Sequence, residues 1–152
     1  MIKNNIIIIS LIFFLGNCGF TPVYLNTTNE NFSIEQINYS GDIVLNNFLK
    51  TNLSNYKNVD SENKIFIEIN SNYNKIILSK DVAGEVTNYQ LQADVVFLIK
   101  PINKKIKITE KKIMDSKNDK FEEARYERTV KQNFALSISN KLKSELIIIN
   151  DI

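Results

Sequence analysis

Histidine and tryptophan are absent from this chain of 152 residues, and the only cysteine is Cys18. Without them the chain cannot form Cys/His zinc sites, Ser-His-Asp triads, Cys-His nucleophiles or internal disulfides. The four glycines form no phosphate-binding loop. A net charge of +2, from 19 basic and 17 acidic side chains, gives no overall field suited to nucleic acid. The inventory therefore predicts a non-enzymatic protein with no metal, no cofactor and no nucleic-acid partner.

The strongest hydrophobic stretch lies at the N-terminus, where the mostly apolar residues Ile6 to Leu15 follow Lys3. This layout is typical of an export signal peptide. A helix of this length is about 15 Å long, against roughly 30 Å of bilayer hydrocarbon, so a permanent transmembrane helix is not expected. A buried core helix is the alternative, but such a helix lacks a capping residue here. We predict a signal peptide over residues 1–17.

The residues that end this stretch, Leu15-Gly16-Asn17-Cys18, resemble the lipobox of bacterial lipoproteins, although Asn17 stands where Gly or Ala is usual. The resemblance implies that Cys18 becomes the first mature residue and carries fatty acyl chains such as palmitate. Several acyl chains anchor a protein firmly, whereas one chain binds only marginally. Gly19 replaces the Asp of an inner-membrane retention signal, so outer-membrane sorting is expected. Residues 18–31 would form the lipid anchor and tether.

The rest of the chain, residues 32–152, alternates between strand and helix patterns. We predict a strand over 32–39, a helix after Asp42 with apolar residues spaced by three and four, and a strand around 65–69 that 76–78 extend. A turn over 79–84 and a long strand from Val86 to Ile99 complete a hairpin. After a turn at 101–103, a charged edge strand runs through 106–114.

Apolar residues recur every four positions in the last segment, from Val130 to Leu146, and predict a long amphipathic helix from Lys120 onward. The element order of strand, helix, three strands and helix predicts an α+β fold, a four-stranded sheet with two helices packed on one face. Tyr89, Leu91, Ala93, Val95 and Phe97 share one strand face, which we interpret as core.

The segment Cys18-Gly19-Phe20-Thr21-Pro22-Val23-Tyr24 resembles the mature start of the LPS-assembly lipoprotein family LptE, in its alphaproteobacterial form. Val86 to Val95 and Ala124 to Leu146 are also similar. The resemblance implies a four-stranded sheet with two helices. It also implies an outer-membrane lipoprotein, facing the periplasm or a barrel lumen, that plugs the LptD β-barrel and assists lipopolysaccharide (LPS) transport to the cell surface. An accessory lipoprotein of another envelope or lipid-transport system is the alternative.

An LPS site needs cations near apolar surface, with arginine favoured for phosphate. Arg125 and Arg128 are the only arginines, and their spacing places them on one helix face. Exposed ion pairs with Glu122, Glu123 and Glu127 are the favoured alternative for this pair. A periplasmic hydrolase using Ser, Lys or carboxylates is a further rival, but no spacing gathers such groups. The candidate LPS-binding residues are Lys75, Lys80, Lys117, Lys120, Arg125 and Arg128.

Overall fold

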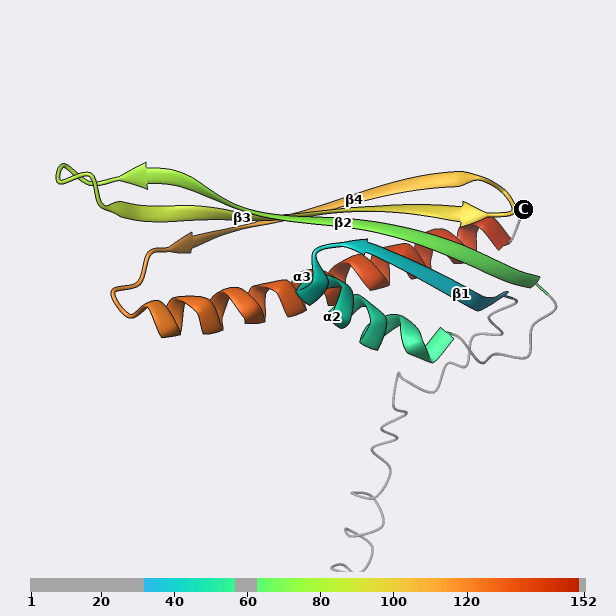
Figure 1. Cartoon of the computed structure of the whole chain (residues 1–152). Coiled ribbons are helices and arrows are strands. Elements are labelled where there is room, and N and C mark those ends of the chain that lie inside the picture. The colour runs from blue at the N-terminus through green and yellow to red at the C-terminus, as the bar shows by residue number, and fades with distance from the viewer. Residues whose placement is uncertain (1–31, 57–62, 151–152) are drawn as a thin grey trace, which may run out of the picture.

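The computed structural model describes residues 32–56 and 63–150, which form one sheet covered by helices. In chain order the elements are β1 (Phe32–Gly41), α2 (Ile43–Leu53), the 3-10 turn η2 (Ser54–Tyr56), β2 (Asn63–Lys80), β3 (Val86–Lys100), β4 (Lys104–Asp115) and α3 (Lys120–Asn150). Both helices lie on the same face of the sheet (Figure 1). The predicted α+β fold, with a four-stranded sheet and two helices, is confirmed. The predicted signal peptide, Cys18 and the tether lie outside the described residues.

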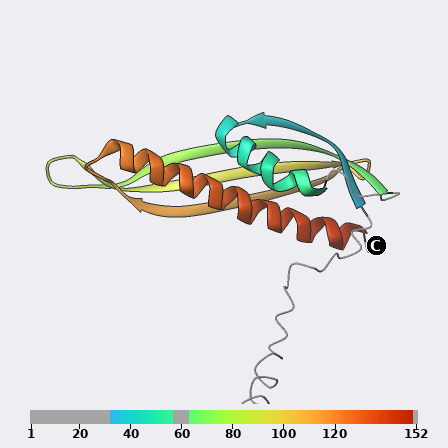
Figure 2. The same cartoon turned by 90° about the horizontal axis from the view of Figure 1, so that it is seen from below.

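The strands are ordered β1-β2-β3-β4 across the sheet. β1 runs parallel to β2 and carries an irregularity between Ile34 and Gln36. β2 and β3 form the predicted antiparallel hairpin, and β4 pairs antiparallel with β3 as the predicted edge strand. Residues 65–69 and 76–78 belong to one strand of 18 residues. The result is an elongated sheet whose long hairpin extends past β1 (Figure 2).

The link from β1 to α2 depends on Gly41 and Asp42. Gly41 has a φ of +97°, and a Cβ atom there would lie 1.8 Å from the Ser71 carbonyl oxygen, so only glycine fits. The Asp42 side chain accepts a 2.7 Å hydrogen bond from the Leu45 N–H, which is the predicted helix cap. These two residues let the chain leave strand β1 at the edge of the sheet and enter helix α2 in the helix layer.

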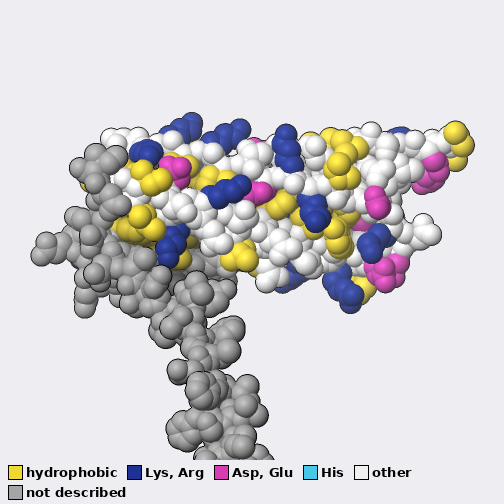
Figure 3. Space-filling view, turned by 180° about the vertical axis from the view of Figure 1, so that it is seen from behind, with side chains coloured by type: hydrophobic (Ala, Val, Ile, Leu, Met, Phe, Trp, Pro, Cys, Tyr) yellow, Lys and Arg dark blue, Asp and Glu magenta, His cyan; other side chains and the backbone are white. Residues whose placement is uncertain are grey.

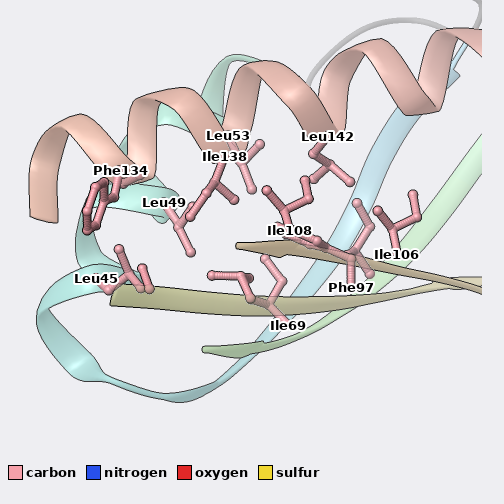
Figure 4. Packing of buried hydrophobic residues seen from close by; sticks show 14 of the residues in the cluster. Leu45, Leu49, Leu53, Ile69, Phe97, Ile106, Ile108, Phe134, Ile138 and Leu142 are labelled. Atoms are coloured by element: carbon pink, nitrogen blue, oxygen red, sulfur yellow. The ribbon is translucent and has the colours of Figure 1, made fainter. Parts of the chain in front are cut away.

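The core lies between the sheet and the two helices (Figure 4). Burial in β3 falls on every second residue, as period-two alternation requires. The α3 stripe predicted from spacing is buried at Val130, Phe134, Ile138, Leu142 and Leu146. Tyr89 packs at the border of this core and is half-buried. The other predicted core residues on its strand face are fully buried: Leu91, Ala93, Val95 and Phe97.

Candidate functional site

A hollow with both apolar and cationic walls lies between the start of α2 and the first half of α3. Its volume is about 470 Å³. Apolar atoms come from Val44, Phe121 and Ala124, and charged groups come from the same stretch of α3. We call this hollow the arginine groove, with these lining residues: Val44, Phe121, Ala124, Arg125, Glu127, Arg128 and Lys131.

The groove gathers the chain's two arginines on one wall, as their spacing predicted. The expected ion pairs with Glu122, Glu123 and Glu127 are wrong: within residues 32–56 and 63–150, no carboxylate pairs with either guanidinium. Arg128 instead lies 5.7 Å from the centroid of the Phe48 ring, a cation–π contact. Within the described residues, neither guanidinium group is therefore neutralised by a carboxylate.

Lys131 is the third cation of the groove, and the sequence analysis missed it. Its Nζ lies 3.3 Å from the Asp42 carboxylate and 3.8 Å from the centroid of the Tyr73 ring. Lys131 follows Arg128 by three positions, as Arg128 follows Arg125, so a search for cations at helical spacing would have found it. Because Asp42 neutralises it, Lys131 contributes less positive potential than the arginines.

Lys75, a predicted LPS-binding residue, connects β2 to α3. Its Nζ donates to Glu123 at 2.7 Å and to Glu127 at 3.2 Å, and it lies 4.3 Å from the centroid of the Tyr89 ring. Burial lowers the pKa of Lys75, but the bonds to both carboxylates outweigh that effect and leave the pKa raised. Lys75 therefore stays charged and holds β2 and α3 together.

Glu123 is the acceptor at the centre of this network and is only 5% exposed. Besides Lys75, it accepts hydrogen bonds from the Lys117 backbone N–H at 3.0 Å and from Lys120 Nζ at 3.3 Å. The bond from Lys75, and then that from Lys117, lower the pKa of Glu123 to about 2. Several donors keep this buried carboxylate ionised, so its charge stabilises the contact between β2 and α3.

The remaining predicted cations lie apart from the groove walls. Lys120 is bound to Glu123, and Lys117 lies 3.6 Å from Glu122. Lys80 ends β2, beside the hairpin turn. The structure thus brings Arg125 and Arg128 together and pairs Lys75 and the exposed Lys120 with Glu123.

The outer face of the sheet, away from the helices, is largely polar in its middle part. Asp94 there accepts a hydrogen bond from Gln92 at 2.6 Å and from Thr109 at 2.7 Å, and Lys107 lies 3.6 Å away. The bonds from Thr109 and Gln92 lower the pKa of Asp94. Figure 3 views the molecule from behind, along the edge of the sheet, and shows Lys and Arg side chains spread along this side with small hydrophobic patches between them. Such a surface suits water or a polar partner.

Two further observations bear on the class of function. Over the described ranges, no helix has both the length and the apolar character to cross a bilayer. In the same residues, no three acidic groups come together in a way that could hold a metal ion.

Comparison with solved structures finds the same architecture in bacterial lipoproteins. Rare lipoprotein B from Shewanella oneidensis superposes with a TM-score of 0.58 at 17% identity, over 76% of this chain and 96% of that one. A minor lipoprotein from Acinetobacter baumannii gives 0.51 at 14% identity, over 73% and 94%. No family model matches the sequence, and neither does any curated protein. At these identities the comparisons establish the shared fold.

Proposed function

We propose that this chain is an outer-membrane lipoprotein of the LptE kind, anchored through lipid on Cys18. It forms a complex with an LptD-type β-barrel as its plug and assists the delivery of LPS to the outer surface. The observation that carries the proposal is the shared fold, which spans nearly all of rare lipoprotein B. The lipobox-like sequence before Cys18 adds independent support.

The polar outer face of the sheet supports a plug role. The interior of a large barrel is lined by polar side chains and water, so a domain that fills it needs a hydrophilic surface. The network around Asp94, with its Gln, Thr and Lys partners, supplies such a surface. No covalent chemistry belongs to this role.

The arginine groove supports contact with LPS. Its two guanidinium groups suit bidentate binding of phosphate, and the neighbouring Val44 and Phe121 suit an acyl chain. An anionic amphiphile therefore matches both properties of the groove.

Co-purification tests the proposal most directly. Full-length protein with a C-terminal tag is purified from detergent-solubilised envelopes, and its partners are identified by mass spectrometry. We expect a stoichiometric outer-membrane barrel together with LPS. Recovery of only small periplasmic proteins would instead support an accessory lipoprotein of another envelope system. Labelling with radioactive palmitate tests the anchor, because the Cys18→Ser variant should lose the label.

A binding titration with purified LPS tests the groove. The double variant Arg125→Glu/Arg128→Glu should bind LPS roughly tenfold more weakly or worse, because charge-assisted contacts to phosphate are lost. The double variant Lys111→Glu/Lys112→Glu on β4 changes the net charge by the same amount, so it is the matched control and should bind within about twofold of wild type. Equal losses in both variants would contradict a specific groove.

A further inference from the structure

β2 is much longer than the strand beside it, and this leaves part of its edge open. The pairing of β1 with β2 ends where Gly41 faces Ser71. The chain then turns away into α2, with the Asp42 N–H donating to the Ser71 carbonyl at 3.1 Å. Residues 72–80 of β2 keep β3 on one side and have no described strand on the other. Figure 2 shows β1 ending beside the long hairpin.

The side chains on this open edge are unusually apolar for an exposed strand. Ile76, Ile77 and Leu78 are 43%, 50% and 47% exposed. Consecutive strand residues point to opposite faces, so apolar surface lies both above and below the edge. An exposed hydrophobic edge strand with free backbone N–H and C=O groups is a template for pairing with another strand.

The opposite edge of the same sheet, strand β4, carries charges that discourage strand pairing, and the open edge of β2 differs from it in this respect. β4 carries five lysines: Lys104, Lys105, Lys107, Lys111 and Lys112. Lysines on an edge strand are a known device against unwanted pairing. A register shift after Ile77 limits the regular part of the β2 edge to residues 72–77.

The open edge is also held in place from beneath. Tyr73 lies under the ammonium of Lys131, and Lys75 is bonded to Glu123 and Glu127 of α3. An edge fixed in advance loses little conformational freedom when a partner strand is added, which favours binding.

We propose that residues 72–77 of β2 bind an extended segment of the partner barrel by strand addition, continuing the sheet beyond the end of β1. The identity of the partner rests on the proposed function. An extended backbone is required, because neither a lipid nor a helix can satisfy a row of alternating backbone donors and acceptors.

The geometry also defines the chemistry of the segment. Apolar side chains face Ile76 on one face of the sheet and Ile77 on the other. Polar side chains lie opposite Asn72 and Asn74.

Site-specific photo-crosslinking in the full chain tests this proposal. A benzoylphenylalanine replaces Asn74 on the open edge, or Lys111 on β4 as the matched control, and crosslinked peptides from illuminated envelopes are mapped by mass spectrometry. We expect the probe at position 74 to crosslink to one extended segment of the barrel, and the probe at 111 not to reach that segment. Adding Ile76→Lys should lower the yield at 74 roughly tenfold, since a charge blocks edge pairing.

Ile113→Lys is the matched control, because Ile113 is also apolar and 64% exposed but lies on the far strand; it should leave the yield at 74 within about twofold. Urea unfolding of both lysine variants checks that each remains folded. Crosslinks from position 74 to lipid or to a second copy, or no crosslink at all, would overturn strand addition. If the barrel still co-purified in that case, the proposed function would stand. Failure of the wild-type chain to bring down any barrel would overturn both.

Discussion

Replacing Glu123 with glutamine removes the charge at the centre of the contact between β2 and α3 while keeping the shape of the side chain. A carboxyl whose pKa is about 2 when folded, against a usual 4.5, favours the folded state. At about 1.4 kcal/mol per pH unit this amounts to about 3 kcal/mol at neutral pH. The side chain is only 6% exposed, so solvent screening is small. We expect Glu123→Gln to lower the free energy of unfolding by about 2 to 3 kcal/mol at pH 7.

The pH dependence follows from the direction of the shift. A lowered pKa gives stability that is fully present above about 4.5 and is lost as the pH falls toward 2. The gap between wild type and Glu123→Gln should therefore be constant from pH 7 to 5 and fall to roughly half by pH 3. Urea unfolding at these three pH values measures it.

Glu122→Gln is the control for this experiment. Glu122 neighbours Glu123 but is 58% exposed, and its only ion pair in the described structure is with Lys117 at 3.6 Å. Its loss should change stability by less than about 0.5 kcal/mol. A Glu123→Gln effect below about 0.5 kcal/mol, or a gap unchanged at pH 3, would refute the structural role assigned to Glu123.

Four other substitutions test the packing around the site by urea unfolding. Leu142→Ala should cost about 2 to 5 kcal/mol, because Leu142 is fully buried on the face of α3 that packs on the sheet; a loss under about 1 kcal/mol would contradict that packing. Gly41→Ala should destabilise strongly and shift the amide signals around Ser71, since the added Cβ meets the Ser71 carbonyl; an unchanged stability would show that the link can move. Asp42→Ala should cost about 1 kcal/mol or more, because it removes both the α2 cap and the partner of Lys131. Lys131→Met, which keeps the cap, should cost less than Asp42→Ala.

Local periodicity was enough to predict most of the elements. The two-residue alternation of β3 and the four-residue recurrence in α3 each reflect one buried face, and both can be read without knowing the neighbours. The parallel pairing of β1 with β2 is different. It joins segments separated by a helix, and no local pattern sets their register or the point where Gly41 ends the pairing.

The ion pairs also join residues that are far apart in the sequence, and local spacing did not predict them. Helical spacing predicted pairs between the arginines and the glutamates of α3, but Glu123 pairs across 48 positions with Lys75. Glu123 and Glu127 continue the buried stripe of Val130 and Phe134 toward the N-terminus, so they face the sheet. A buried carboxylate gains more from a cation opposite it than from an exposed neighbour on its own helix. Extending the core periodicity into charged residues would have predicted this contact.

The two halves of α3 now have different roles. The half from Phe134 to Leu146 packs on the apolar core, which supplies most of the stability. The half from Lys120 to Lys131 forms ion pairs with β2 and with Asp42, the N-cap of α2, and it carries the arginine groove. Arginines without an ion pair in the described residues and an exposed apolar edge both cost stability or solubility. Because most of the core packs against the other half of α3, the fold can keep these features in one half of the molecule, where the barrel strand and the anionic lipid that we propose would bind.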